Sequence, residues 1–240
     1  MLAREGWGGI LLIMSFKLIF LINNSKIFHI LELIMIWKLF FGKNKDLTEK
    51  VDWLVACLGN PGSKYAGTRH NIGWMCAAEI CKNYHLQIES LSNIYLQAHY
   101  KIDEQNIMLV MPTTYMNKSG EALKRISERY KIPTEKIILV FDELNFPLGK
   151  LHLRYGGGNG GHNGVASVIE ELGNSDFYRL RCGIGNDFPP GGMIDYVLSP
   201  FNVDEQDTVK KMIEKTPDCI ELLLRYGKMR AMTDINSGNI

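Results

Sequence analysis

Three short runs of consecutive apolar residues restrict the fold more than any other feature of this sequence. They lie at residues 54–58, 107–111 and 137–141, and each stops at a glycine, a proline or an aspartate. Short apolar runs that are bounded in this way are typical of buried strands. A strand that is apolar at every position is covered on both faces, as in parallel sheets that are flanked by helices. We therefore expect a parallel sheet at the centre of the molecule.

The segments around these strands carry helical or alternating patterns. Helical spacing of apolar residues occurs in 71–84, 119–130, 163–173 and about 203–226, whereas 94–102 and 178–185 alternate as strands do. We expect Asn163 to cap the third helix and Pro217 to interrupt or kink the fourth. Strands that alternate with helices predict an α/β fold. The prediction for residues 51–240 is one α/β domain, in which helices flank a mostly parallel, twisted mixed sheet.

The first fifty residues differ in composition from the rest of the chain. Their two strongly apolar stretches are GILLIMSFKLIFLI and IFHILELIMIWKLFF. Charged residues interrupt both, so neither reaches the roughly 20 uninterrupted apolar residues of a membrane helix. We expect residues 1–50 to be an extension outside the fold. The favoured interpretation is a start of translation at Met14 or Met35; an anchoring or interfacial apolar segment comes second and a cleaved signal peptide third.

Charge and cysteine content narrow the classes of function. The formal net charge of +1 gives no overall attraction to nucleic acid, although it is compatible with a local basic patch. No pair of the five cysteines has the C-x-x-C spacing of a zinc or redox site, and their apolar surroundings favour a reducing compartment. The sequence contains neither H-E-x-x-H nor G-x-S-x-G. We therefore expect no metal site and no serine nucleophile.

Polar residues follow each of the three predicted strands. In open α/β sheets, ligands bind at the carboxyl ends of the strands. We therefore expect the residues that follow these strands to form one site. They are Asn60 and His70 after the first strand, Tyr115, Met116 and Asn117 after the second, and Asp142 after the third.

His70 and Asp142 are the candidate catalytic pair. A histidine that acts as a general base needs a partner to fix its tautomer, and a carboxylate at the end of a buried strand can be that partner. From the residues alone, two other interpretations stay open: His70 bonded to a backbone carbonyl, and Asp142 as a helix or turn cap. Asn60 and Asn117 can polarise a carbonyl or hold a water, or they can be turn residues. The turn interpretation is strong for Asn60 in G-N-P-G.

The segment YGGGNGGHNG at 155–164 contains six glycines in ten residues. Such a density of glycine indicates a close approach of the backbone to another group, or a mobile loop. The segment has neither the P-loop nor the dinucleotide-binding pattern. An anion or a polar backbone could still dock at the N-terminus of the helix that follows. We expect His162 to be a plain helix-start residue and not a second ligand-facing group.

Several longer motifs together resemble those of one known family. LGNPGSKYAGTRHNIG, PTTYMNKSG, DELNFPLGK and GGGNGGHNG, in this order and spacing, resemble the bacterial peptidyl-tRNA hydrolase family. RLRCGIG and DYVLSPF are similar to its later motifs, so the resemblance covers about residues 51–232. It implies an enzyme that hydrolyses the ester between a peptide and tRNA and thereby returns tRNA to translation. It also implies a cytoplasmic monomer with no cofactor and no obligate protein partner.

The resemblance implies roles for individual residues. His70 would activate water as the base, Asp142 would orient His70, and Asn60 would sense the blocked amino group of the substrate. The substrate-binding residues would be Tyr65, Tyr115, Met116, Asn117 and Asn163. Recognition of tRNA also requires cations for its phosphates. Arg154 and Arg181, on predicted strands near the Gly-rich segment, are our candidates for these contacts; the alternative for both is a solvated strand face.

Three residues depart from the family pattern. Cys57 stands where a glycine is more frequent, Asn145 where an acid is usual, and His152 where lysine is frequent. We expect Asn145 to affect the rigidity or charge of its loop, and His152 to affect the affinity for tRNA. The competing hypothesis is a non-catalytic RNA-binding paralogue on the same scaffold. Loss of the catalytic set would favour it, but that set is complete here.

Overall fold

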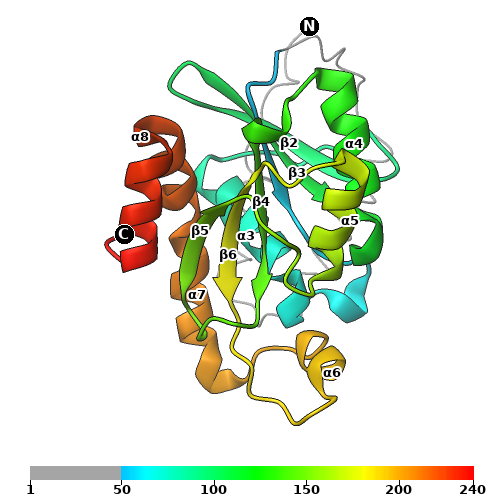
Figure 1. Ribbon diagram of the computed structural model, residues 1–240, viewed down its shortest axis with the longest axis vertical. Helices are drawn as coiled ribbons and strands as arrows, with labels where there is room; N and C mark the ends of the chain where they lie inside the picture. The colour runs from blue at the N-terminus through cyan, green and yellow to red at the C-terminus, as the bar shows by residue number, and fades with distance from the viewer. Residues whose placement is uncertain (1–49) are drawn as a thin grey trace, which may run out of the picture. The chain divides into compact units, whose positions relative to one another are not determined.

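The computed structural model describes residues 50–240, in which six strands form one sheet of order β2-β3-β1-β4-β6-β5 (Figure 1). The strands are β1 Trp53–Cys57, β2 Tyr95–Ile102, β3 Gln105–Pro112, β4 Ile137–Glu143, β5 Leu151–Tyr155 and β6 Tyr178–Gly183. The four inner strands run parallel, and β2 and β5 are antiparallel to their neighbours at the two edges. The predicted mostly parallel mixed sheet is confirmed.

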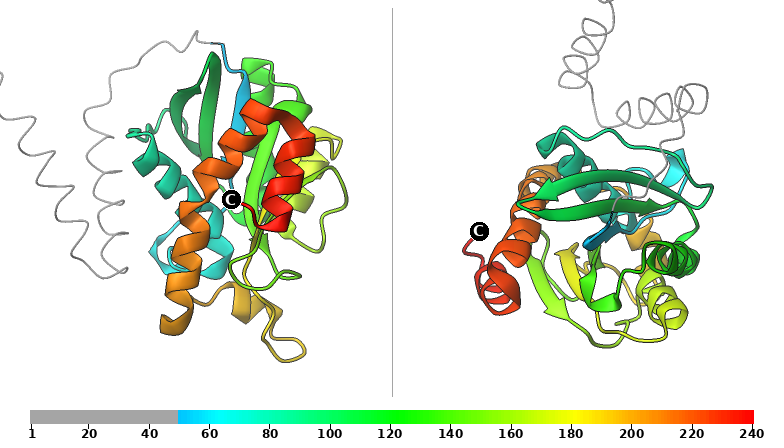
Figure 2. Two further views of the ribbon diagram at one scale, coloured as in Figure 1. Left: turned by 90° about the vertical axis from the view of Figure 1, so that its left-hand side faces the viewer. Right: turned by 90° about the horizontal axis from the view of Figure 1, so that it is seen from above.

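Helices cover both faces of this sheet. They are α3 Ile72–Asn83, α4 Ser119–Tyr130, α5 Asn163–Leu172, α6 Met193–Val197, α7 Gln206–Glu214 and α8 Thr216–Ser237. Short 3-10 turns lie at η1 Ser63–Tyr65, η2 Arg69–Asn71, η3 Met116–Lys118, η4 Thr134–Lys136 and η5 Val203–Glu205. The pair α4 and α5 packs on one face, and α3, α7 and α8 pack on the other (Figure 2).

The uninterrupted apolar pattern of β1 follows from this layering. All five of its residues are buried. Leu54 and Ala56 belong to the core beneath α4 and α5, whereas Val55 and Cys57 belong to the core beneath α3, α7 and α8. Burial of a Val or Leu side chain stabilises a fold by about 1.5–3 kcal/mol, so a strand between two cores gains from every position and not only from alternate ones.

The structure corrects one expectation about the helices and bears out another. Asn163 is the first residue of α5, and the cap is His162, whose side chain accepts hydrogen bonds from the backbone of Gly164 and Val165. The helix predicted at about 203–226 is interrupted beside Pro217, as expected: α7 ends at Glu214 and α8 begins at Thr216. Pro217 lies in the first turn of α8, where a missing N–H is tolerated. The bend in α8 comes later, at Gly227.

The expectations for residues 1–49 lie outside the described residues. From residue 50 onward, no helix combines the length and the apolar character that a crossing of the bilayer requires.

The strand order creates one position at which loops diverge. From β1 the chain passes through α3 towards the β2–β3 side of the sheet, and from β3 it passes through α4 to β4 on the other side of β1. The loops at the carboxyl ends of β1 and β4 therefore leave in opposite directions. In open α/β folds, this switch point is where ligands bind.

A glycine allows α3 to begin directly against these strand ends. Gly73 is the second residue of α3, and it is fully enclosed by the backbones of β4 and of the residue after β1. A Cβ at this position would lie 2.6 Å from the carbonyl oxygen of Val140 and 2.7 Å from the amide nitrogen of Leu58, and it would also meet the carbonyl oxygen of Leu58. This close packing determines where η2, immediately before α3, sits above the sheet.

We predict that Gly73→Ala destabilises the fold by about 1–3 kcal/mol, because the added methyl group overpacks the contact between α3 and the sheet. The gain in helix propensity, about 1 kcal/mol, offsets only part of this loss. Urea unfolding should give a lower midpoint at an unchanged slope.

The matched control is Gly67→Ala, since a Cβ at Gly67 meets no atom within 4 Å. Gly67→Ala should keep the native midpoint. Equal midpoints for the two variants would contradict the role of Gly73.

Candidate active site

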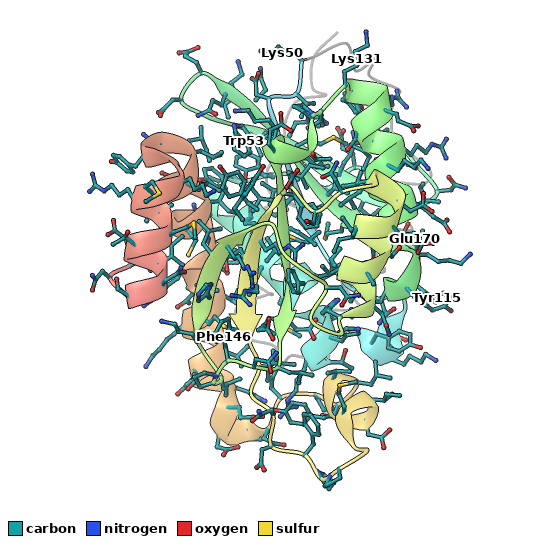
Figure 3. All side chains as sticks on the ribbon, in the orientation of Figure 1. Lys50, Trp53, Tyr115, Lys131, Phe146 and Glu170 are labelled. Atoms are coloured by element: carbon teal, nitrogen blue, oxygen red, sulfur yellow. The ribbon has the colours of Figure 1, made fainter. Side chains whose placement is uncertain are left out.

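The loops at the carboxyl ends of β1, β3 and β4 bring the predicted polar residues together. Asn60 follows β1, Met116 begins η3 after β3, and Asp142 is the penultimate residue of β4. His70 reaches the same region from η2. Tyr115 and Phe146, which lie in loops at this end, are far from Trp53 and Lys131 at the opposite end of the molecule (Figure 3).

The structure places His70 in contact with Asp142. Nδ1 of His70 lies 2.9 Å from Oδ1 and 3.0 Å from Oδ2 of the carboxylate. The side chain of Asp142 is 3% exposed and that of His70 is 12% exposed. An ionised carboxylate only accepts hydrogen bonds, so Nδ1 of His70 is the donor. The lone pair of the imidazole is then on Nε2, the nitrogen that faces away from Asp142.

His162 is a second imidazole partner of the same carboxylate. Its Nε2 lies 2.9 Å from Oδ1 of Asp142. Its Nδ1 accepts hydrogen bonds from the amides of Gly164 and Val165, at 3.1 and 3.2 Å. Because Nδ1 accepts, the ring proton is on Nε2 and is donated to Asp142. The expectation of a plain helix-start residue was therefore incomplete, since His162 both caps α5 and binds Asp142.

Two imidazoles compensate for the burial of Asp142. Burial alone raises the pKa of this carboxyl, but its electrostatic interactions with His162 and His70 and the hydrogen bonds from both rings outweigh burial and hold the pKa of Asp142 well below its usual value. The aspartate is therefore ionised throughout the physiological range. A buried anion of this kind can fix the direction of an imidazole and stabilise its protonated form.

The same three side chains could in principle hold a metal ion, because one ligand atom of each lies within 4.8 Å of the others. The hydrogen bonds at α5 argue against this. A metal on Nε2 of His162 would require the proton to move to Nδ1, where two backbone amides already donate. The arrangement therefore fits a hydrogen-bond network that orients the two imidazoles better than a metal centre.

Asn60 is held by a second asparagine. Its backbone N–H donates to Oδ1 of Asn71, and its carbonyl accepts from Nδ2 of Asn71, both at 2.9 Å. The side-chain oxygen of Asn60 accepts from the amide of Met116 at 2.8 Å. The side chain thus reaches across to η3 and does not bond within its own turn. The NH2 group of Asn60 keeps its capacity to donate to a substrate.

The predicted substrate-binding residues divide between the interior and the rim. Met116 is buried, and its sulfur packs against Gly164 at the start of α5. Tyr115 is 57% exposed, and its ring meets that of Tyr65 edge-on with centroids 6.5 Å apart. Asn117 and Asn163 are both exposed, the first in η3 and the second at the start of α5.

Three arginines lie on one face of the edge strand β5 and its neighbour β6. Arg154 pairs in register with Arg179, and Arg181 follows two residues later on the same face. Arg179 is buried, and its two terminal nitrogens donate to the carbonyls of Gly157 and Gly158. Burial, together with the charges of Arg154 and Arg181, lowers the pKa of Arg179 to about 10. Like charges directly opposite each other destabilise a sheet, so an anion at this face would relieve the repulsion.

The Gly-rich loop packs directly on these cations. Gly157 has a φ of 106°, which favours glycine, and a Cβ there would lie 2.8 Å from a terminal nitrogen of Arg154. Glycine therefore permits both the backbone conformation and the close approach of the loop to the exposed Arg154.

Arg181 is less available than Arg154. Its guanidinium forms an ion pair with Glu143 at 3.2 Å and donates to Nδ1 of His152 at 3.0 Å. Phe146 stacks on His152 and also lies beneath the guanidinium. Asn145 closes the same loop, because its backbone and side-chain amides both donate to Oε1 of Glu143. An aspartate at position 145 would repel the carboxylate of Glu143, whereas the amide of Asn145 donates a hydrogen bond to it.

Sequence reasoning missed three residues that shape this site. His162 was discounted because a histidine at a helix start has an ordinary capping role. Asn71 follows His70 directly, but nothing local indicates that it bonds to the backbone of Asn60. Arg179 lies in an alternating strand, where only the cross-strand register reveals that it faces Arg154. Their functions depend on contacts between segments that are distant in sequence.

One family of known proteins is similar to this chain in both sequence and fold. The profile of the family described as peptidyl-tRNA hydrolase matches residues 54–240. The peptidyl-tRNA hydrolase of Syntrophomonas wolfei is 37% identical over 179 residues, which are 75% of this chain and 97% of the relative. That of Aquifex aeolicus is 39% identical, over 76% of this chain and 95% of the relative.

A solved structure gives the same result at the level of the fold. The crystal structure of peptidyl-tRNA hydrolase from Acinetobacter baumannii superposes with a TM-score of 0.73 at 31% identity, over 79% of this chain and 97% of the other. The fold, the order of the motifs and the extent of the match agree, and we conclude that this chain belongs to the peptidyl-tRNA hydrolase family.

Proposed function

We propose that this member of the peptidyl-tRNA hydrolase family hydrolyses the peptide–tRNA ester with His70 as general base. The supporting observation is the hydrogen-bond chain from the backbone at the start of α5 through His162 and Asp142 to His70. This chain leaves the lone pair of His70 on Nε2. In the proposed mechanism, Nε2 takes a proton from water as the water oxygen attacks the ester carbonyl, whose π electrons move onto its oxygen. When this tetrahedral intermediate collapses, the ester C–O bond breaks and the imidazolium of His70 returns the proton to the departing ribose oxygen of tRNA. Asp142 stabilises the imidazolium that forms.

Amides supply the remaining contacts of the proposed mechanism. Asn60, whose oxygen is held by Met116, offers its NH2 group to the substrate beside the blocked amino group. Asn117 in η3 and Asn163 at the start of α5 are exposed, and in the proposed mechanism they hold the peptide backbone and the attacking water or oxyanion. Met116 forms the buried wall, and Tyr65 and Tyr115 form the rim. An oxyanion donor contributes about 10²–10³ in rate, and a general base about 10²–10⁴.

We further propose that the face formed by Arg154, Arg179 and Arg181 binds tRNA phosphates. Arg154 is exposed and contacts a phosphate directly in this proposal. Arg181 adds its positive charge while it stays paired with Glu143 and hydrogen-bonded to His152. The support is electrostatic: three guanidiniums face one another, and only one of them pairs with a carboxylate that the structure describes. Cations that neutralise phosphates supply most of the affinity for nucleic acid.

We also propose that the protein acts as a monomer in the cytoplasm. The monomer is what the resemblance to the peptidyl-tRNA hydrolase family implies. All five cysteines are buried free thiols, which suits a reducing compartment.

His70→Asn should lower kcat for release of an N-blocked amino acid from charged tRNA by about 10²–10⁴. The amide of asparagine can replace the Nδ1–H donor towards Asp142 but supplies no base in place of Nε2. The matched control is His85→Asn, because His85 is exposed and has a positive φ that asparagine tolerates. Charged tRNA with a free amino group tests selectivity. A folded His70→Asn enzyme with near-native kcat would exclude His70 as the base.

The stability that Asp142 contributes should depend on pH in a defined direction. Its pKa is lower in the folded state than in the unfolded state, where it is about 3.9. The stabilisation of the fold by ionised Asp142 is therefore complete at pH values above the pKa of the unfolded state, and it is lost as the pH falls below it. The difference in free energy of unfolding between the native protein and Asp142→Asn should narrow between pH 5 and pH 2. A difference that is constant or grows towards pH 2 would contradict an ionised buried Asp142.

Arg154→Gln should weaken tRNA binding and reduce the slope of log affinity against log salt by about 1. Binding is measured in the His70→Asn background, so that peptidyl-tRNA stays intact. The matched control is Arg129→Gln, because Arg129 is exposed at the far end of α4. Equal salt slopes for the two variants would place the phosphate contacts elsewhere.

A further inference from the structure

Arg69 is a buried arginine immediately before the candidate base. It is the first residue of η2, and His70 is the second. Arg69 is only 2% exposed. A buried cation is costly unless it is paired and hydrogen-bonded, so the contacts of Arg69 need an explanation. They all lie in one distant segment of the chain.

The guanidinium of Arg69 holds residues 196–205 from several sides. One terminal nitrogen donates to Oγ of Ser199 at 3.1 Å and to the carbonyl of Pro200. The other donates to Oε2 of Glu205 at 2.6 Å. The rings of Tyr196 and Phe201 pack on the guanidinium, with centroids 4.4 and 5.0 Å from Cζ.

The backbone strengthens the same connection. The amide of Arg69 donates to the carbonyl of Ser199 at 3.0 Å, and Thr68 forms an antiparallel bridge with Pro200. The segment is itself anchored, because the hydroxyl of Tyr196 donates to the carbonyl of Ile184 at 2.7 Å, just after β6. The loop that carries His70 is thereby tied to the segment after β6 and not only to its own strand.

We propose that Arg69 is a positioning residue that fixes the orientation of His70 towards Asp142 by clamping η2 to residues 196–205. The inference rests on the proposed role of His70. With about three residues per turn in a 3-10 helix, neighbouring side chains point roughly 120° apart. Arg69 therefore faces the segment while His70 faces β4, and fixing one direction fixes the other.

The chemistry of the clamp requires arginine. A planar guanidinium can donate to several oxygens in one plane while aromatic rings cover its faces, whereas an ammonium group cannot do both. Arg69→Lys keeps the charge and most of the volume but loses this geometry. Since a misplacement of about 1 Å can cost roughly 10²-fold in rate, we expect a loss of that order in kcat. KM should stay within about threefold, because Arg69 does not belong to the proposed substrate contacts.

The first experiment compares kcat and KM of native protein and Arg69→Lys with N-blocked aminoacyl-tRNA. The second records the proton spectrum of the imidazole N–H groups. The resonance of the His70 Nδ1–H that bonds to Asp142 is identified by its loss in His70→Asn. In Arg69→Lys this resonance should be broadened or lost, while the resonance of His162 is retained.

Two further variants separate positioning from general loss of stability. Ile126→Val alters the core beneath α4, away from Arg69, and should keep native kcat and the His70 resonance. Glu205→Gln removes the charged partner of Arg69 and should lower kcat in the same way, although less. The double variant Arg69→Lys/Glu205→Gln should be no worse than Arg69→Lys alone, because both act through one clamp.

Native kcat in folded Arg69→Lys, a loss confined to KM, or an unchanged His70 resonance would overturn the proposal. These results are distinguishable from failure of the proposed mechanism. If His70→Asn is inactive and Arg69→Lys is fully active, the assignment of His70 as the base stands and the positioning role of Arg69 is excluded. If His70→Asn is active, the assignment of His70 as the base is excluded, whatever the activity of Arg69→Lys.

Discussion

One buried carboxylate connects the parts of this site. Asp142 ends a parallel strand and accepts hydrogen bonds from two imidazoles, His70 and His162, which come from loops far apart in the sequence. A buried carboxylate without partners would strongly destabilise the fold, so the charge of Asp142 is stable only when both loops are in place. The same requirement determines the chemistry. With Asp142 ionised, each imidazole must direct an N–H towards it, and the basic nitrogen of His70 points the other way.

Buried arginines hold the two loops that carry these histidines. Arg69 ties the His70 loop to residues 196–205, and Arg179 ties the Gly-rich loop before His162 to β6 through backbone carbonyls. Backbone carbonyls and aromatic rings are suitable partners, because a guanidinium keeps its charge even when its pKa falls. The surroundings of these two arginines differ. Arg69 has a carboxylate partner and faces the interior, whereas Arg179 faces other arginines beside the surface, where a phosphate would relieve the repulsion.

Much of the fold could be predicted from local pattern. The runs around Leu54, Met108 and Leu139 are apolar at every position because each strand lies between two cores, and that pattern needs no knowledge of the partners. The cap of α5 was misplaced by one residue, since histidine is a less usual cap than asparagine. Pro217 correctly indicated the break between α7 and α8, because proline is tolerated in the first turn of a helix and not in its interior.

The sequence by itself determined the layered α/β architecture, the strand ends that carry polar residues, and membership of the family. These depend on periodicity and on motifs of contiguous residues. Only the tertiary structure decided that His162 shares Asp142 with His70, that Asn71 holds the backbone of Asn60, and that Arg69 clamps a distant segment. Such contacts join residues whose separation along the chain carries no periodic signal, because hydrogen bonds between loops are set by how the elements pack and not by local propensity.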